Sequence, residues 1–348
     1  MTESPPPFLS VITRTQGRRP HTLMETLANL AAQTDQDFEL LLMAHRVDSA
    51  GQASLQAALA ALPETARFRR RLISVHGGTR TAPLNAGLDA AAGTYAAVLD
   101  DDDIVLPNWV ATFRHMATES PGRMLRAATR QQRVIEQRTD GQAHAVPVGE
   151  LEAAFPDHFD FFAHLSANRT APVALAFPLA RLRALGLRFD DALTTTEDWD
   201  FILRCAGPLG VATCADITSI YRYWEQGECS RTVHTDAEWH ANFLAISAKL
   251  DAAPFVLPPA SFVRLRALQD DLAAANAEVA RLRCHLVDAR ERHDAAAAEI
   301  AALRQSPPDA EALLVRLRAL EHSTSWRMTA PLRWLWARLR GHHRRLPG

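Results

Sequence analysis

The sequence predicts an α/β domain with a mostly parallel sheet flanked by helices, followed by a coiled-coil helix and an amphipathic helical tail. Three observations lead to this fold class. Strand-like and helix-like segments alternate over residues 8–100, and four adjacent aspartates follow the last strand-like segment. A heptad repeat of apolar residues then begins at Leu265.

The composition is that of a globular protein. The chain has 348 residues, of which 47% are hydrophobic, and a formal net charge of -2 at pH 7. This length allows one large core or two smaller ones, and the near-neutral charge argues against nucleic acid as a partner. The 4 cysteines have no C-x-x-C spacing, so we expect neither a zinc site nor a disulfide framework. Without a signal-peptide pattern or a spanning apolar stretch, the sequence predicts a cytoplasmic protein.

The elements of the α/β domain follow from short apolar runs and helical spacing. Residues 8–13 are rich in β-branched side chains and predict the first strand. After a turn-rich segment, the spacing of Leu23, Leu27 and Leu30 predicts a helix. Alternation of this kind indicates a parallel sheet whose ligands bind at the carboxyl ends of its strands. Further strands are predicted over residues 38–43, 71–76 and 94–100, and further helices over residues 54–68 and 85–93.

Four consecutive carboxylates, Asp100 to Asp103, follow the fourth predicted strand at this edge. Because like charges side by side repel one another, a positive partner is expected there. Such carboxylates can hold a divalent cation through one or two oxygens while a diphosphate supplies further ligands. The alternatives are an acidic surface loop or a helix start before Pro107, where negative charge is favoured.

A second acidic group, formed by Glu197, Asp198 and Asp200, precedes an apolar helical stretch. Displacement at a sugar carbon needs a base that takes the proton of the acceptor hydroxyl, and a carboxylate can serve. The alternative is helix capping, with Thr195 or Thr196 as the cap and the acids in the first turn.

Three segments together resemble the inverting family 2 glycosyltransferases, which have the GT-A fold. They are "LSVITRT...RP..L.ETLANLAAQT.QDFELLLM", "LNAGLDAAAGTYAAVLDDDD" and "TTEDWDFILRCA". The resemblance implies transfer of a sugar from a nucleotide-diphosphate donor to a hydroxyl of a glycan or lipid-linked acceptor in cell-surface polysaccharide biosynthesis, as in bacterial members. We expect this domain to span residues 8–250, after a disordered N-terminus of residues 1–7.

The resemblance also assigns roles to individual residues. Asp102 and Asp100 would bind Mg²⁺ or Mn²⁺, with Asp100 also near the ribose of the donor. A metal ion beside the leaving nucleoside diphosphate stabilises its developing charge. Asp198 matches the catalytic base of the family, and Glu197 and Trp199 would contact the acceptor. The remaining residues that we assign to donor binding are Thr13, Arg14, Thr15, Arg80, Asn85 and Asp101.

The sequence departs from the family pattern at three places. Residues 44–45 are Ala and His where members commonly carry an acid that reads the nucleobase, and Leu84 stands where an Arg is common. Trp224 lies near the place where a His is frequent, so His234 or Arg231 is a candidate substitute.

After the predicted catalytic domain the character of the sequence changes. Residues 251–262 contain prolines and predict a linker, and residues 263–305 predict a coiled-coil helix interrupted only by His293 in one seam. A coiled coil implies a homo-oligomer or a partner helix, whereas the alternative is a helix folded back on the catalytic domain. The seam residues are Leu265, Leu272, Val279, Leu286 and Ile300 in one series and Leu268, Ala275, Leu282, Ala289, Ala296 and Leu303 in the other.

Residues 306–348 predict an amphipathic helical tail that mixes apolar side chains with arginines. This composition suits a helix lying in a membrane interface, so we expect peripheral contact with the inner face of the membrane. The alternative is a tail that packs on its own protein. The apolar side chains concerned are Trp326, Leu332, Trp334, Leu335, Trp336 and Leu339.

Two other functions are consistent with parts of this pattern. A nucleotidyltransferase that makes the activated sugar shares an αβα nucleotide fold, but the sequence lacks a glycine-rich phosphate loop near its start. The second alternative is a non-catalytic scaffold that is organised by the coiled coil. Nucleotide-sugar hydrolysis with Mn²⁺ indicates the transferase, and release of pyrophosphate from a nucleoside triphosphate indicates the nucleotidyltransferase.

Overall fold

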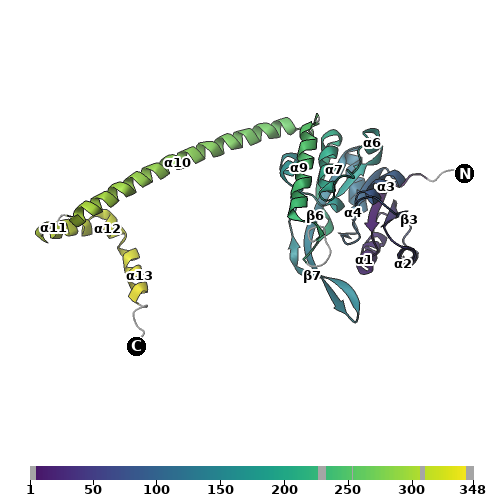
Figure 1. Cartoon of the computed structure of the whole chain (residues 1–348), viewed down its shortest axis with the longest axis horizontal. Coiled ribbons are helices and arrows are strands. Elements are labelled where there is room, and N and C mark those ends of the chain that lie inside the picture. The colour runs from purple at the N-terminus through teal and green to yellow at the C-terminus, as the bar shows by residue number, and fades with distance from the viewer. Residues whose placement is uncertain (1–4, 226–232, 253, 306–309, 342–348) are drawn as a thin grey trace. The chain divides into compact units, whose positions relative to one another are not determined.

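The computed structural model describes residues 5–225, 233–252, 254–305 and 310–341. Parts of the predicted N-terminus and tail, namely residues 1–4, 306–309 and 342–348, lie outside the described residues. The chain divides into two compact units, Met1–Phe262 and Val263–Gly348, and each is described by itself (Figure 1).

The first unit is built on one mixed sheet. Its strands are β1 (Leu9–Thr15), β2 (Phe38–His45), β3 (Arg69–Val75), β4 (Tyr95–Val98), β5 (Ile104–Val105), β6 (Met124–Thr139), β7 (Gln142–Glu152), β8 (Leu175–Pro178) and β9 (Val211–Trp224). Over the described residues these nine strands follow the order β3-β2-β1-β4-β8-β6-β9-β5, and β7 pairs with β6. The strands β3, β2, β1 and β4 are parallel, as the alternating sequence predicts. In the rest of the sheet, β6 and β9 are parallel, whereas the other pairs are antiparallel.

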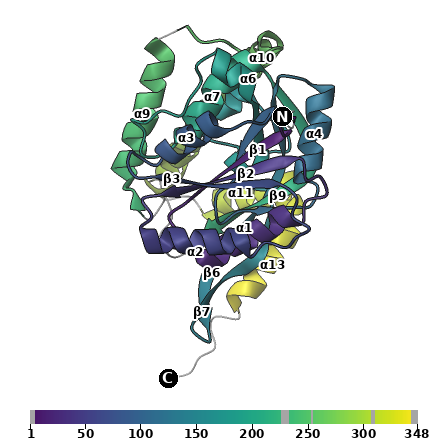
Figure 2. The ribbon, with the colours of Figure 1, turned by 90° about the vertical axis from the view of Figure 1, so that its right-hand side faces the viewer.

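Helices cover both faces of the sheet. They are α1 (Pro20–Ala31), α2 (Ser49–Ala60), α3 (Ala82–Ala90), α4 (Trp109–Glu119), α5 (Phe161–Ser166), α6 (Leu179–Ala184), α7 (Glu197–Leu209) and α9 (Asp236–Ala252). A short 3-10 turn, Pro172–Ala174, precedes β8. Figure 2 shows α1 and α2 on one side of β1 to β3 and α3 and α7 on the other.

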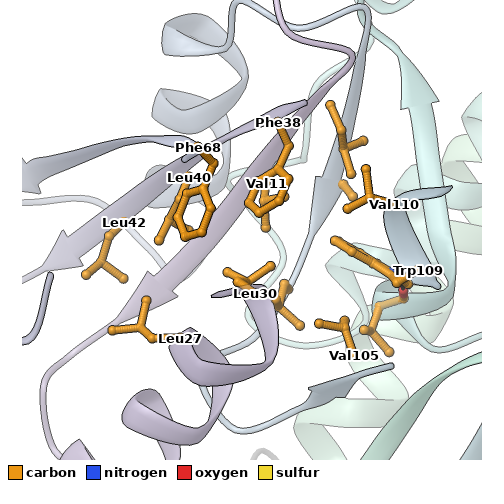
Figure 3. Close-up of a cluster of buried hydrophobic side chains, with 14 of the residues drawn as sticks. Val11, Leu27, Leu30, Phe38, Leu40, Leu42, Phe68, Val105, Trp109 and Val110 are labelled. Atoms are coloured by element: carbon orange, nitrogen blue, oxygen red, sulfur yellow. Dashed lines mark hydrogen bonds between the residues drawn. The ribbon is translucent and has the colours of Figure 1, made fainter. Parts of the chain in front are cut away.

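Alternating side chains of the central strands divide the core into two layers. Val11 and Leu40 face α1, α2 and α4, whereas their neighbours Ile12 and Leu41 face α3, α6 and α7. In the first layer Leu27 and Leu30 of α1 point toward the sheet (Figure 3). All of these side chains are fully buried, so both faces of the strands are apolar, as expected for a parallel sheet between helices.

The predicted helix over residues 54–68 is wrong at both ends. The helix α2 begins at Ser49, where the Asp48 side chain accepts a hydrogen bond of 2.7 Å from the Gly51 N–H. It ends at Ala60, because Pro63 cannot continue a helix. Beyond it, Phe68 stacks on Phe38 at 4.4 Å between ring centroids and so belongs to the core.

The register of the parallel strands positions the candidate site. Ile12 of β1 lies opposite Val98 of β4, so the residues that follow them leave the sheet at the same edge. Arg14 and Thr15 therefore lie beside the acidic run that begins at Asp100.

The second unit consists of α10 (Ser261–Gln305), which begins in the last residues of the first unit, α11 (Ala310–Glu321), α12 (Thr324–Met328) and α13 (Ala330–Gly341). The predicted seam of α10 is exposed, with Leu272 at 62% and Leu286 at 52% of full exposure. In the tail, the Arg333 guanidinium lies 3.7 Å from the ring centroid of Trp326. No helix in the described part of the chain has both the length and the hydropathy needed to cross a membrane.

Candidate active site

A cavity of about 740 Å³ lies at the carboxyl ends of β1 and β4. The start of α7 also contributes to its wall, so the two acidic motifs of the sequence meet there. The predicted site residues that line it are Arg14, Thr15, Arg80, Asp100, Asp101, Asp102, Glu197 and Asp198.

Arg14 connects the two acidic motifs. Its Nε lies 2.9 Å from Asp100 Oδ1, and its Nη1 lies 3.0 Å from Glu197 Oε1. Burial alone would lower the pKa of Arg14, but the charges and hydrogen bonds of Asp100 and Glu197 outweigh burial and raise it. Arg80 approaches the same Glu197 oxygen at 2.8 Å. Two guanidinium groups therefore share one buried carboxylate at the base of the cavity.

The next three carboxylates occupy different surroundings. Asp101 Oδ2 accepts a hydrogen bond of 2.5 Å from the Thr15 hydroxyl, and Asp103 Oδ1 accepts one of 2.9 Å from the Arg222 N–H. Burial and the repulsion of Asp102 raise the pKa of Asp101 to about 7. Burial and the neighbouring carboxylates also raise the pKa of Asp102 and of Asp103. Asp103 is buried beneath the site, whereas the other two line the cavity.

Asp102 has two partners on the same oxygen. Arg19 Nη1 lies 3.0 Å from Asp102 Oδ2, and Trp224 Nε1 donates a hydrogen bond of 2.8 Å to it. The Arg19 guanidinium carbon also lies 4.4 Å from the centroid of the Trp224 ring. Arg19 was not among the predicted site residues, although "GRRP" before a helix places it at the ligand edge of the sheet.

The residues fit a divalent cation that takes few ligands from the protein. Within the described ranges, no group of three or more His, Cys, Asp or Glu side chains is arranged to hold a metal ion. Asp100, Asp101 and Asp102 nevertheless line one cavity, and repulsion among them contributes to the raised pKa of Asp101 and Asp102. A hard cation prefers carboxylate oxygens and would relieve this repulsion.

Asp198 lies in the first turn of α7, with one donor on each carboxylate oxygen. Asn168 Nδ2 donates a hydrogen bond of 2.8 Å to Oδ2, and the Trp199 N–H donates one of 2.8 Å to Oδ1. Burial and the charge of Glu197 raise the pKa of Asp198 to about 6. Asn168 follows α5 in a loop and was missed, because no sequence pattern connects a loop asparagine with an acid 30 residues later.

The structure bears out the capping alternative for this motif in part, since Glu197, Asp198 and Asp200 lie in the first turn of α7. Thr196 is the N-cap residue of α7, but its side chain makes no capping hydrogen bond. Its hydroxyl instead donates to the Thr195 carbonyl oxygen at 2.6 Å, and its φ of 59° is left-handed. A β-branched residue rarely adopts this conformation, so the backbone is strained directly before Glu197 and Asp198.

Two neighbours of Asp198 have structural contacts. The Trp199 side chain is buried, donates from Nε1 to the His164 carbonyl oxygen at 2.7 Å, and stacks on Phe243. Asp200 is also buried and accepts hydrogen bonds from Lys249 at 2.8 Å and from Arg204 at 2.6 Å. Trp199 therefore does not line the cavity, whereas Trp239 does.

Two residues predicted to bind the donor do not line the cavity either. Thr13 is fully buried in β1. Asn85 holds the backbone of Phe189, donating to its carbonyl oxygen and accepting from its N–H, each at 3.0 Å. Where the sequence departs from the family pattern, His45, Leu84, Trp224 and His234 all line the cavity, and Arg231 lies outside the described residues.

Comparisons with known proteins support this fold. Residues 10–122 match the family model described as "Glycosyl transferase family 2". The structure is similar to that of Staphylococcus aureus TarS 1-349 in complex with UDP-GlcNAc, with a TM-score of 0.53 and 15% identity over 69% of this chain and 66% of that one. This chain thus spans just under two thirds of the TarS structure.

A second similar structure is the mannosyltransferase PcManGT from Pyrobaculum calidifontis in complex with GDP-Man and Mn²⁺. Its TM-score is 0.53, with 17% identity over 93% of this chain and 83% of that one. A search of curated protein sequences gives no match. At these identities the structural likeness concerns the fold alone. The match to the family model covers the segment that contains β1 to β4 and the four aspartates. Residues 10–122 therefore match glycosyl transferase family 2, and the structure has the GT-A fold.

Proposed function

We propose that the chain transfers a sugar, with inversion, from a nucleotide-diphosphate sugar to a hydroxyl of a glycan or lipid-linked acceptor in cell-surface polysaccharide biosynthesis. The observation that supports this most is that one cavity contains both the Asp100–Asp102 carboxylates and Asp198. A donor site and a base are the two parts that direct displacement at a sugar carbon requires.

Asp198 is the base in this proposal. With a pKa of about 6 its carboxylate is mostly ionised at neutral pH, and it is a stronger base than an ordinary aspartate. The donors on its two oxygens, Asn168 and the Trp199 N–H, fix its orientation. It would take the proton of the acceptor hydroxyl as that oxygen attacks the sugar carbon and the nucleoside diphosphate leaves.

The donor site in this proposal is the part of the cavity where Asp100 and Asp102 lie near Arg14 and Arg80. Asp102 and Asp100 would hold Mg²⁺ or Mn²⁺, which when bound neutralises charge on the leaving diphosphate. Arg14 and Arg80 add positive charge beside them. PcManGT is described with GDP-Man and Mn²⁺ and TarS with UDP-GlcNAc, so ligands of this class suit the fold.

The test is a donor screen on the full chain. Release of nucleoside diphosphate from UDP-, GDP- and dTDP-sugars is measured with Mn²⁺ and with EDTA, and Asp198→Asn serves as the matched control. Metal-dependent release from one class of donor supports the proposal. Release of pyrophosphate from a nucleoside triphosphate, or no turnover with any donor, would contradict it in favour of a nucleotidyltransferase or a scaffold.

We also propose that the exposed seam of α10 pairs with a second copy of the chain. Leu272, Leu282 and Leu286 are each more than half exposed, and burying them against a partner helix removes apolar area from water. The double variant Leu272→Glu with Leu286→Glu should sediment as a monomer. Val287→Glu is the control, because Val287 is equally exposed but lies outside the seam.

The tail is the third part of the proposal. In α12 and α13, Met328, Leu332 and Leu335 are all more than half exposed, and Arg327 and Arg333 lie in the same segment. We propose that this segment lies in an anionic membrane interface and brings the enzyme to its acceptor. Leu339 of the predicted apolar set lies outside the side chains that the structure describes.

A further inference from the structure

The carboxylate assigned to the metal has a cationic partner within the chain. The Asp102 Oδ2 atom accepts both the Arg19 guanidinium at 3.0 Å and the Trp224 indole N–H at 2.8 Å. The Arg19 and Asp102 side chains are only about one fifth exposed, and all three residues line the same cavity.

We propose that Arg19 and the divalent cation are alternative partners of Asp102. Arg19 holds Asp102 while the donor is absent, and the arriving cation with its diphosphate displaces the guanidinium from this carboxylate. The freed guanidinium remains in the cavity, where the diphosphate is its new partner. This inference rests on the proposed function, because it requires a divalent cation at Asp102.

The surroundings of Asp102 explain why a resident counter-ion is needed. Its neighbours Asp100, Asp101 and Asp103 are also acids. Arg14 pairs with Asp100, and Arg19 is the guanidinium that offsets the charge of Asp102. Arg19 immediately precedes Pro20 at the N-cap of α1, where the helix dipole disfavours a cation. An arginine there is therefore accounted for by the carboxylate that it faces rather than by the helix.

Trp224 would keep Asp102 in position while Arg19 and the cation exchange places. Its indole N–H keeps Asp102 oriented, and its ring face supports the Arg19 guanidinium at 4.4 Å. An indole N–H can donate a hydrogen bond but cannot coordinate a metal ion. The residue thus contributes to the geometry of the carboxylate and adds no ligand to the cation.

The test measures Mn²⁺ binding directly, through the electron paramagnetic resonance signal of free Mn²⁺ titrated with the full chain. The variant Arg19→Met removes the charge at similar length, and Arg19→Gln gives the same reading if the Met variant does not fold. The matched control is Arg71→Met, which removes one positive charge from β3, where Arg71 bonds the Ala90 carbonyl oxygen.

Without nucleotide, Arg19→Met should bind Mn²⁺ about three- to tenfold more tightly than the natural chain, since the competing ion pair is partly exposed. The control should bind Mn²⁺ as the natural chain does. With Mn²⁺ saturating, the same variant should bind UDP or GDP less tightly, because the freed guanidinium is missing.

Two results would overturn the inference, and they differ in what else they affect. Equal Mn²⁺ affinity of Arg19→Met and the natural chain would overturn the competition and leave the proposed glycosyl transfer intact. Absence of Mn²⁺ binding by every variant, even with UDP or GDP present, would overturn both the competition and the metal-dependent function.

Discussion

The guanidinium of Arg14 lies 3.0 Å from the carboxylate of Glu197, and this contact ties the end of β1 to the start of α7. The two residues are 183 positions apart in the sequence. Because Glu197 is almost fully buried, its charge depends on Arg14 and Arg80 for compensation. The placement of Asp198, the proposed base next to Glu197, therefore depends on a residue of the first strand.

Replacing Arg14 with Met should destabilise the fold and weaken donor binding. Glu197 would keep one of its two guanidinium partners, so we expect a loss of about 2 kcal/mol in the free energy of unfolding. Urea denaturation measures this loss, with Arg71→Met as the control at an exposed edge strand. An unchanged unfolding midpoint would show that Arg80 alone compensates Glu197.

Asp102→Asn should abolish metal-dependent binding of the nucleotide diphosphate and leave the fold intact. The pKa of Asp102 is raised in the folded chain by burial and by its acidic neighbours, so the ionised group destabilises the fold at neutral pH. Asparagine removes that repulsion, and the free energy of unfolding should stay equal or increase. Calorimetric titration with Mn²⁺ and UDP or GDP checks the binding, and Asp140→Asn in the β6–β7 turn is the control. Unchanged Mn²⁺-dependent affinity would contradict the metal assignment.

Asp198→Asn should keep donor binding and lose transfer by roughly 10²- to 10⁴-fold, because the acceptor proton then has no base. In the natural chain the rate should fall as the pH drops through about 6, the pKa to which burial and Glu197 raise this carboxyl group. Only the ionised form accepts the proton, so activity is present above this pH and lost below it. A rate that is independent of pH between 5 and 7 would place the base elsewhere.

Asn168→Ala should move the midpoint of that pH profile upward. The Asn168 side chain donates to the ionised form of Asp198, and removal of a donor to the charged form raises the pKa. Asn168→Asp should move it further, because a second carboxylate would repel the first. Steady-state rates from pH 5 to 9 show the shift, and a profile unchanged in both variants would assign Asn168 a purely structural role.

Removal of residues 323–348 should release the protein from anionic vesicles and leave transfer to a soluble acceptor unchanged. The lost segment contains Trp326, Leu332 and Leu335, and its basic residues each contribute roughly 1 kcal/mol near an anionic surface. Co-sedimentation with phosphatidylglycerol vesicles at low and high salt compares the two forms. If the natural chain also stays in the supernatant at low salt, the tail does not bind membranes.

The predicted site residues that the structure brings into one cavity lie where a strand or a helix fixes the direction of the side chain. Asp100, Asp101 and Asp102 follow a buried strand, and Glu197 and Asp198 begin a helix, so their order along the chain already sets their place at the sheet edge. Periodicity likewise predicted the parallel strands β1 to β4.

Other positions depend on contacts between distant segments, for which local patterns contain no signal. The Asn85 side chain donates a hydrogen bond to the carbonyl oxygen of Phe189, and the Trp199 indole donates one to the carbonyl oxygen of His164. Asn168 reaches Asp198 from a loop whose course only the tertiary structure determines. The sequence did not predict the antiparallel pairs in the second half of the sheet, because they also join distant segments. The strand β8, for example, pairs with both β4 and β6.

The left-handed backbone of Thr196 implies that stability of the fold and catalytic rate make opposite demands at the start of α7. Glycine would adopt this φ without a steric penalty and should make the chain more stable by about 1 kcal/mol. It would also loosen the turn that presents Glu197 and Asp198, so the more robust protein should be the slower catalyst. A laboratory search for heat-resistant variants would therefore be expected to find glycine at this position, and a search for faster enzymes would be expected to retain threonine.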